Sequence, residues 1–310
     1  MTKKFKKIFV NSLGSFNLNL PVLLIGQGKP RVSLVIGLHG NETSGLFVVE
    51  ELLKNITLKK GSLSIVLAAN PLAQLLQIRH NPIDLNDLNR VFPGSVDGTS
   101  SAQIAKKLIE FLRGSELVID LHAFTAHAPL FGIMFRHGTP KAQQQAKKFL
   151  RLFNPEIIWQ LDANKPHEHR LRKGLGIELM RLGIPNFAIE LQDPDILPNE
   201  MVNRTIQGIK RILRHLDMTD VAVPKPKSKI PIFERFVIRA TNSGLFHPNK
   251  DLLLQKVRAG ITVASITTLP SFKTAVISSP KTGILLEIRR KGIVQSSDKL
   301  FSLGHKVGDL

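Results

Sequence analysis

The sequence feature that most constrains the fold is a strand–helix–strand pattern between residues 32 and 69. Residues 32–38 are rich in branched apolar residues, which is typical of a buried strand. Apolar residues then recur at helical spacing between residues 46 and 53, and residues 63–69 form a second buried run. Strand, helix and strand in this order indicate a sheet of parallel strands covered by helices, so we predict an α/β fold.

The loop after the first of these strands reads His39-Gly40-Asn41-Glu42. A histidine and a glutamate separated by two residues at the carboxyl end of a strand can turn together toward one divalent ion, in the crevice where open α/β sheets bind ligands. Such a short spacing also arises by chance, so these four residues alone leave the question of a metal open. The chain has no cysteine, so any metal here must take histidine and carboxylate ligands.

A third predicted strand, residues 117–121, brings Asp120 and His122 to its carboxyl end. In a parallel sheet this end lies at the same edge as His39. A lone histidine after a strand is more often a hydrogen-bonded structural residue, but this one completes a set of two histidines and one carboxylate with His39 and Glu42. Asp120 is expected to support this site or the loop around it.

A fourth apolar run, residues 186–190, ends in Glu190. One interpretation is a salt-bridged residue at the end of a strand. The other is functional, because a hydrolase with a metal site needs a nearby carboxylate that takes a proton from the attacking water. The residues themselves leave both interpretations open.

The segment from Arg79 to Gly94 is dense in Asp, Asn and Arg. It is either a surface loop held by Asx turns or part of a binding site. Arg79, Asn89 and Arg90 make a plausible set for gripping an anion, since a guanidinium group matches a carboxylate with two hydrogen bonds.

The best candidate for a domain boundary is the proline-rich, basic segment 223–231. Residues 1–222 carry the alternating strands and helices and are predicted to form one α/β domain. Residues 232–310 instead show short strands separated by Gly, Pro and Asn, including one expected at 252–257. This pattern of short strands and turn residues predicts a smaller all-β domain, either a barrel or a sandwich.

The net charge of +19 suggests attraction to something acidic, such as nucleic acid, an anionic surface or a substrate with carboxylates. Lysine and arginine are spread along the chain and tyrosine is absent, whereas a platform for single-stranded nucleic acid interleaves aromatic and basic residues. We therefore expect no specific nucleic-acid partner. No apolar run reaches the length of a membrane helix and no signal peptide is evident, so we expect a cytoplasmic protein without a membrane partner.

Five short motifs in order give the chain a resemblance to the succinylglutamate desuccinylase/aspartoacylase family, zinc hydrolases related to the metallocarboxypeptidases. They are HGNE, NPLA, Arg79 with DLNR-VFPG, DLH ending at His122, and IEL around Glu190. The resemblance covers essentially the whole chain, because the family also carries a C-terminal barrel, here ending in SSPKTGILLEI and LFSLG. It implies a zinc-carboxypeptidase-like mixed sheet flanked by helices, with a smaller C-terminal all-β barrel-like domain.

Carried over by position, the resemblance implies that His39, Glu42 and His122 bind one zinc ion per chain. It also makes Glu190 the general base and acid. Three protein ligands leave a zinc ion one open position, which suits a catalytic site, although histidine and carboxylate ligands also suit other divalent ions.

The same resemblance assigns Arg79 to polarising the scissile carbonyl, where it opposes the developing negative charge. It assigns Asn89 and Arg90 to holding a carboxylate of a small-molecule substrate.

Two departures from the family leave the acyl group of the substrate open. Gln192 stands two positions after Glu190, where the family usually has glycine, and no tyrosine is available for any role that the family gives to one. The arginine that some members use for an acyl-side carboxylate has no clear match, and Arg172 and Arg181 are only candidates.

The function that these features favour is zinc-dependent hydrolysis of the amide bond of an N-acyl amino acid or a related N-acylated amine. A metallocarboxypeptidase that acts on peptides and a noncatalytic basic binding protein on the same scaffold are the alternatives. The C-terminal barrel is expected to wall the active site or to mediate formation of a homo-oligomer.

Overall fold

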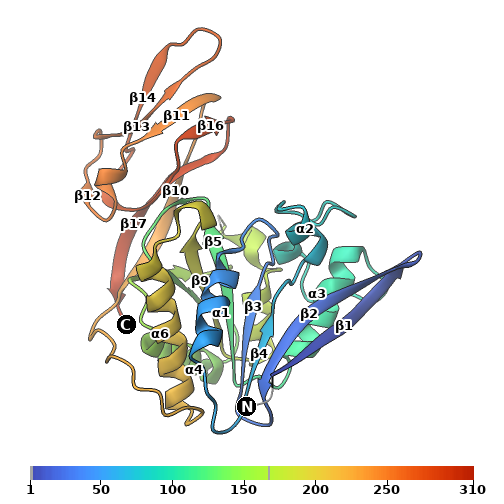
Figure 1. Cartoon of the computed structure of the whole chain (residues 1–310). Coiled ribbons are helices and arrows are strands. Elements are labelled where there is room, and N and C mark those ends of the chain that lie inside the picture. Colours follow the sequence, from blue (N-terminus) through green and yellow to red (C-terminus); the bar gives the residue numbers. More distant parts are fainter. Residues whose placement is uncertain (1–2, 167) are drawn as a thin grey trace.

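The computed structural model describes residues 3–166 and 168–310 and shows a large mixed sheet flanked by helices, with a smaller all-β part beyond it (Figure 1). The strands up to residue 192 are β1 (Lys3–Leu13), β2 (Phe16–Gly26), β3 (Arg31–Ile36), β4 (Ser62–Val66), β5 (Leu117–Phe124), β6 (Ala126–His127), β7 (Phe131–Phe135), β8 (Ile157–Leu161) and β9 (Asn186–Gln192). The α-helices are α1 (Ser44–Lys54), α2 (Pro71–Leu75), α3 (Ser100–Leu112), α4 (Pro140–Phe153), α5 (Leu175–Arg181) and α6 (Asn199–His215).

The predicted parallel strands lie at the centre of the large sheet, whose order begins β1-β2-β4-β3-β5-β9-β7-β8. Strand β3 pairs in parallel with β4 on one side and β5 on the other, and β5 pairs in parallel with β9. Strands β3, β4 and β5 are covered on both faces, which is why they read as continuous apolar runs in the sequence. Their shared direction places the carboxyl ends of β3, β5 and β9 at one edge.

Helices cover both faces of these central strands. Because side chains alternate along a strand, Leu34 and Ile36 pack in the cluster that includes α1, α4 and α6, whereas Val35 packs in the cluster that includes α3 and α5. In Figure 1, α1 and α6 lie in front of the sheet. Each fully buried Leu, Ile or Val side chain stabilises the fold by about 1.5–3 kcal/mol relative to an exposed one. Packing on both faces therefore fixes the edge of the sheet where the carboxyl ends of β3, β5 and β9 lie.

The C-terminal part is all-β, as predicted. Its strands are β10 (Pro231–Arg239), β11 (Gly244–Pro248), β12 (Lys256–Val257), β13 (Thr262–Thr267), β14 (Thr274–Ser278), β15 (Gly283–Arg289), β16 (Gly292–Val294) and β17 (Lys299–Asp309). Strand β10 pairs in parallel with β8, and β17, β15 and β12 continue the large sheet from there. Strands β14, β13, β11 and β16 form a separate sheet. The domain boundary at 223–231 stays a prediction.

The prediction of a strand at residues 252–257 is largely wrong. Residues 250–252 form the 3-10 turn η4, and only Lys256 and Val257 are extended, in β12. Leu254 has a positive φ of 62°, which breaks the extended backbone within the predicted range. The short strands β11 and β16 were not predicted, because each has only a few residues between turns.

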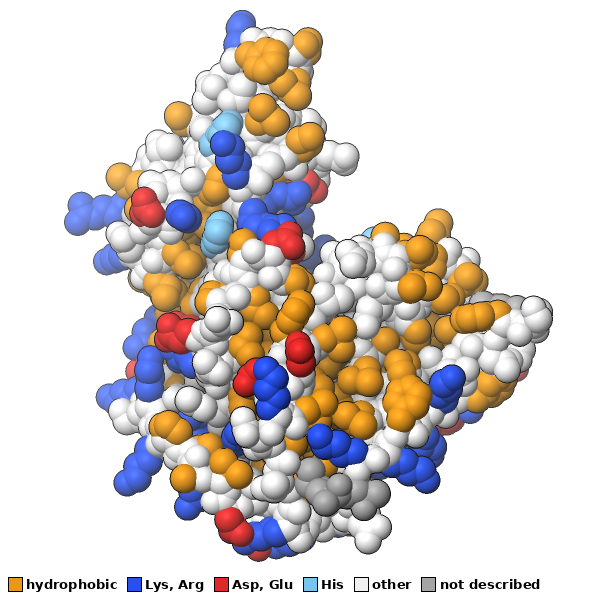
Figure 2. Space-filling model, in the orientation of Figure 1, with side chains coloured by type: hydrophobic (Ala, Val, Ile, Leu, Met, Phe, Trp, Pro, Cys, Tyr) orange, Lys and Arg blue, Asp and Glu red, His pale blue; other side chains and the backbone are white. Residues whose placement is uncertain are grey.

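The surface is basic on the face drawn in Figure 2. Lys and Arg side chains are spread over that face, including the region where the C-terminal strands meet the helical body. In the described ranges, 3–166 and 168–310, no helix combines the length and the apolar character needed to cross a membrane.

Candidate metal centre and catalytic pocket

The loop that carries His39 and Glu42 is a tight turn after β3. The backbone N–H of Glu42 donates a hydrogen bond of 3.1 Å to the carbonyl oxygen of His39, which brings both side chains toward the same region. Gly40 lies against α2: a Cβ atom there would be 2.0 Å from the carbonyl carbon of Ala73. Only glycine therefore fits at this position, because backbone atoms cannot move aside cheaply.

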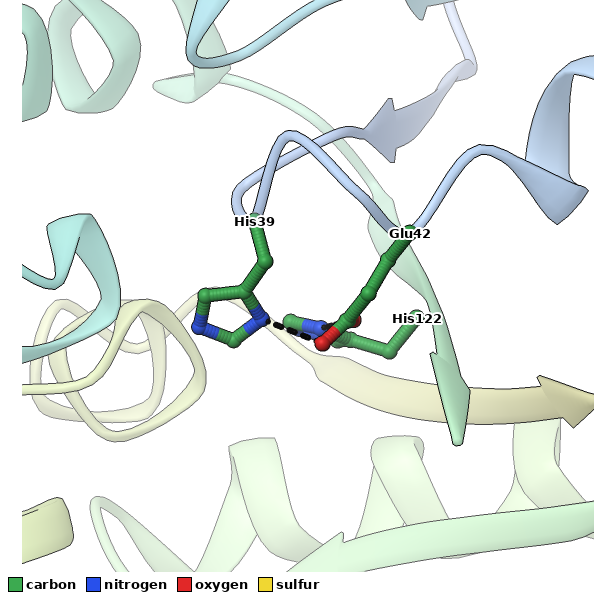
Figure 3. Close-up of side chains that lie close together, drawn as sticks. All are labelled: His39, Glu42 and His122. Atoms are coloured by element: carbon green, nitrogen blue, oxygen red, sulfur yellow. Dashed lines mark hydrogen bonds and ion pairs between the residues drawn. The ribbon is translucent and has the colours of Figure 1, made fainter. Parts of the chain in front are cut away.

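His39, Glu42 and His122 come together at the edge of the sheet (Figure 3). His39 Nδ1 lies 2.8 Å from Glu42 Oε1, and His122 Nδ1 lies 2.8 Å from Glu42 Oε2. All three side chains are buried, and one candidate donor atom from each lies within 4.8 Å of the others. The residues predicted from two separate strands thus meet around a single point.

The outer nitrogen of each histidine is bound by an aspartate. His39 Nε2 donates to Asp87 Oδ1 at 3.0 Å, and His122 Nε2 donates to Asp120 Oδ2 at 2.8 Å. Carboxylates in this position orient histidine ligands and raise their basicity. Both rings therefore direct Nδ1 toward Glu42 and the centre. The supporting position expected for Asp120 is confirmed, whereas Asp87 was not predicted, since it lies within a loop that reads as a run of turn residues.

These donors fit a divalent metal such as zinc. Among the described residues, His39 Nδ1 has no hydrogen-bond partner although it is buried and 2.8 Å from a carboxylate oxygen. Two imidazole nitrogens and one carboxylate form the donor set of many catalytic zinc sites. Burial raises the pKa of Glu42, but His39 and His122 lower it by more. The pKa therefore lies well below its ordinary value, and the carboxylate is ionised.

Glu190 lies directly beside this cluster. It is the partner of His122 in the parallel pairing of β9 with β5, and it lines the same cavity of about 630 Å³. Burial raises the pKa of Glu190 to about 7, with the charge of His122 opposing that shift. A carboxylate with a pKa near neutrality both accepts and donates a proton readily.

The predicted loop residues also line this cavity. Arg79 donates to Glu42 Oε1 at 3.1 Å and to Asp87 Oδ2 at 3.0 Å. Its guanidinium group is therefore fixed against the candidate metal ligands His39, Glu42 and His122, here called the ligand cluster. Asn89 Oδ1 accepts a hydrogen bond of 2.8 Å from the backbone N–H of Leu175. Arg90 donates to the carbonyl oxygen of Asn89 at 2.7 Å.

A further group of cavity residues comes from the C-terminal strands and was not predicted. Arg235, Arg239, Arg289 and Lys299 all line the cavity. Arg235 is held in place, because its guanidinium carbon lies 3.7 Å from the ring centroid of Trp159. No local motif marks these residues, since they reach the site only through the pairing of β10 with β8.

Arg172 and Arg181 are not among the residues that line the cavity. Arg172 Nε donates to the carbonyl oxygen of Ala163 at 3.0 Å, and Arg181 forms an ion pair of 2.6 Å with Glu178. Gln192, the departure noted near Glu190, donates through Nε2 to the carbonyl oxygen of Ala128 at 2.6 Å.

Comparison with known proteins gives one curated relative and many similar structures. The N-α-acetyl-L-2,4-diaminobutyric acid deacetylase of Halomonas elongata is 30% identical over 132 residues, which cover 41% of this chain and 39% of that enzyme. The crystal structure of an aspartoacylase family protein from Mesorhizobium loti has a TM-score of 0.82 at 22% identity and covers 99% of this chain and 95% of its own. The product-bound structure of the ectoine utilization protein EutE (DoeB) from Ruegeria pomeroyi has a TM-score of 0.84 at 21% identity. The match covers 98% of this chain and 94% of that one.

These structural neighbours share the fold of this chain from end to end. The family model for the succinylglutamate desuccinylase/aspartoacylase catalytic domain matches residues 28–216, which is more than half of the chain and includes the ligand cluster, Glu190 and the Arg79–Arg90 loop. The chain belongs to the succinylglutamate desuccinylase/aspartoacylase family.

Proposed function

We propose that this chain is a zinc-dependent amidohydrolase that cleaves the amide bond of an N-acyl amino acid or a related N-acylated amine. The observation that carries the proposal is the meeting of His39, Glu42 and His122 around one point, with Glu190 opposite His122 on the next strand. Membership of a family of deacylases supports the same reaction.

His39, Glu42 and His122 would hold the zinc ion. A zinc ion held there would act as a Lewis acid, polarising the amide carbonyl and lowering the pKa of a water molecule. Glu190 takes a proton from the attacking water as the new carbon–oxygen bond forms. It then passes this proton to the departing nitrogen as the carbon–nitrogen bond breaks. The second proton of the water remains on the new carboxylic acid and passes to the more basic amine, so a carboxylate and an ammonium group leave the site.

Arg79 and the adjacent loop provide charge stabilisation and binding. The guanidinium group of Arg79 lies at the ligand cluster, where it opposes the negative charge that develops on the carbonyl oxygen. Arg90 and Asn89 hold a carboxylate of the substrate, with Arg90 supplying charge-assisted hydrogen bonds. Asn89 is itself fixed by its hydrogen bond to the N-terminus of α5.

The test is elemental analysis of the purified protein together with a screen of N-acetyl and N-succinyl amino acids. We expect about one zinc per chain and hydrolysis of at least one compound. His39→Ala should lose both the metal and the activity. His305→Ala is the matched control, because His305 is an exposed histidine on β17 and should keep both.

Wild-type protein that neither contains zinc nor takes it up would exclude the proposed metal centre. Hydrolysis of peptides in preference to N-acyl amino acids would instead identify a carboxypeptidase on the same site.

A further inference from the structure

The first strand of the large sheet carries a cluster of positive charge that the proposed reaction does not use. Residues 3–7 include four lysines, and all four are exposed. In the described ranges 3–166 and 168–310, none of them has a carboxylate oxygen within ion-pair distance. Strand β1 lies at an edge of the sheet, where lysines prevent pairing with another chain. Protection of the edge would explain the lysines alone.

The same strand also exposes two aromatic rings, which protection of an edge does not require. Phe5 is 55% exposed and Phe9 is 53% exposed. Exposed apolar side chains on an edge strand promote aggregation, which is the opposite of what the lysines achieve. The two rings are therefore better explained by a ligand. This interleaving of Phe and Lys is confined to the start of the chain, so the spread of basic residues over the whole sequence conceals it.

Phe5, Lys7 and Phe9 lie on one face of the β1–β2 hairpin. Side chains alternate along a strand, and the register with β2 is regular from residue 3 to residue 9, so no bulge interrupts the alternation. The opposite face carries Val10, which packs in the cluster that includes α3. The two rings are about 14 Å apart along the strand, with Lys7 between them. Figure 1 shows the hairpin at the edge of the sheet, away from the C-terminal strands.

Aromatic rings that alternate with lysine on an open face of a sheet match single-stranded nucleic acid. A base stacks on each ring, and the ammonium group meets the phosphate chain that joins the bases. The net charge of +19 adds a long-range attraction for the same polyanion. An anionic bilayer fits this face less well, because Asn19 stands opposite Phe9 on β2 and would lose its contact with water if the ring entered the lipid. Repulsion between the lysines disfavours a second copy of the chain.

We propose that the exposed face of β1, formed by Phe5, Lys7 and Phe9, binds single-stranded nucleic acid without regard to base sequence. The rings supply stacking, and the lysines supply the attraction to phosphate. Every base has a face that stacks, so this platform does not choose among sequences. None of the three residues lines the catalytic cavity, so the proposal stands independently of the hydrolase function.

The first test measures binding of a fluorescein-labelled oligo(dT) of about 15 nucleotides by fluorescence anisotropy. We expect a dissociation constant in the micromolar range at low salt, which rises as salt is added. Phe5→Ala and Phe9→Ala should each raise this constant by about tenfold without changing its salt dependence, because stacking releases no counterions. Phe9→Trp keeps a stacking ring and should keep the affinity. Phe272→Ala, which removes an exposed ring of the C-terminal part, is the matched control and should bind as wild type does.

The second test separates the charge of Lys7 from the stacking of its neighbours. Lys7→Gln should weaken binding of oligo(dT) and reduce the slope of log affinity against log salt concentration by about one. Lys291→Gln, which removes an exposed lysine between β15 and β16, should leave this slope unchanged. Equal slopes in the two variants would remove Lys7 from the platform.

Equal dissociation constants for wild type, Phe5→Ala and Phe9→Ala would overturn the proposal, because the attraction would then come from charge alone. The oligo(dT)·oligo(dA) duplex is a further check, since its bases are already stacked on each other. The Phe variants should bind this duplex as wild type does, and an equal loss on duplex and single strand would contradict stacking.

Sedimentation with vesicles of phosphatidylcholine and phosphatidylglycerol tests the bilayer as the alternative partner. Vesicle binding that depends on Phe9, together with oligo(dT) binding that does not, would replace nucleic acid by a membrane surface. Thermal unfolding of each variant accompanies both assays. Because the two rings are exposed, we expect the variants to unfold close to the wild-type temperature, so a loss of binding reports the surface and not the fold.

Discussion

Glu190 is the parallel-strand partner of His122, so a buried carboxylate stands next to a histidine of the ligand cluster without belonging to it. The relationship depends only on the pairing of β5 with β9 and on the register between them. Both residues line the same cavity. This arrangement separates the group proposed to move the proton from the groups that would hold the metal.

Replacing Glu190 by glutamine should abolish proton transfer while leaving the ligands in place. We expect kcat/KM for the best substrate to fall by about 10²–10⁴-fold, with the metal content unchanged. Steady-state kinetics and elemental analysis on the same preparation measure both quantities. Glu200→Gln, at an exposed position in α6, is the control and should behave as wild type. A Glu190→Gln variant as fast as wild type would remove this residue from the mechanism.

The aspartate behind His122 should contribute to metal affinity. Asp120→Asn keeps the shape of the side chain but weakens its hydrogen bond to His122 Nε2, so we expect metal affinity to fall by about 10–100-fold. Competition with a chelator of known affinity measures the change. Asp97→Asn, at an exposed loop position, serves as the matched substitution. Equal affinities in the two variants would show that Asp120 does not orient the ligand.

Loss of Arg90 should weaken substrate binding more than it slows the chemical step. Arg90→Gln removes the charge that would face a substrate carboxylate, so KM should rise by about tenfold or more while kcat changes little. Initial-rate kinetics over a wide range of substrate concentration separate the two parameters. An unchanged KM would exclude Arg90 from the carboxylate site. Arg113→Gln removes an exposed arginine elsewhere and controls for the change in net charge.

Glu287 should stabilise the C-terminal part in a pH-dependent way. Its buried carboxylate accepts hydrogen bonds from Arg235 at 3.0 Å and from Lys299 at 2.9 Å. Glu287→Gln leaves both cations without their counter-charge, so the free energy of unfolding at pH 7 should fall by about 3–5 kcal/mol. Denaturant unfolding measures the difference, and Glu116→Gln at an exposed position is the control.

The direction of the pH dependence follows from the pKa of Glu287. Burial raises this pKa, but the charges of Lys299 and Arg235 lower it by a larger amount. The pKa therefore lies below the ordinary value of 4.5. Its stabilisation is therefore complete above pH 4.5 and is lost as the pH falls through the folded-state pKa. The gap between wild type and Glu287→Gln should stay constant from about pH 7 to pH 5 and narrow below that. A gap that does not change in acid would contradict the ionised pair.

The central architecture and the ligand cluster could be predicted from the sequence because both follow from local pattern. Apolar runs of strand length, joined by a helix of regular spacing, specify parallel strands, and parallel strands place their carboxyl ends together. His39 and His122 follow from this rule, and Glu190 lies near the carboxyl end of β9. The family resemblance supplied their roles, which remain proposals.

The rest of the cavity was decided by tertiary structure. The sequence pattern around Asp87 predicts only a turn. Asp87 becomes a partner of His39 because its loop folds back over the edge of the sheet that carries His39. Arg170 and Arg239 are 69 positions apart and line the same cavity only because β10 pairs with β8 and carries its end there. Sequence periodicity reports which residues share a face of one element. It does not report which distant elements pair, because that depends on packing and register across the whole sheet.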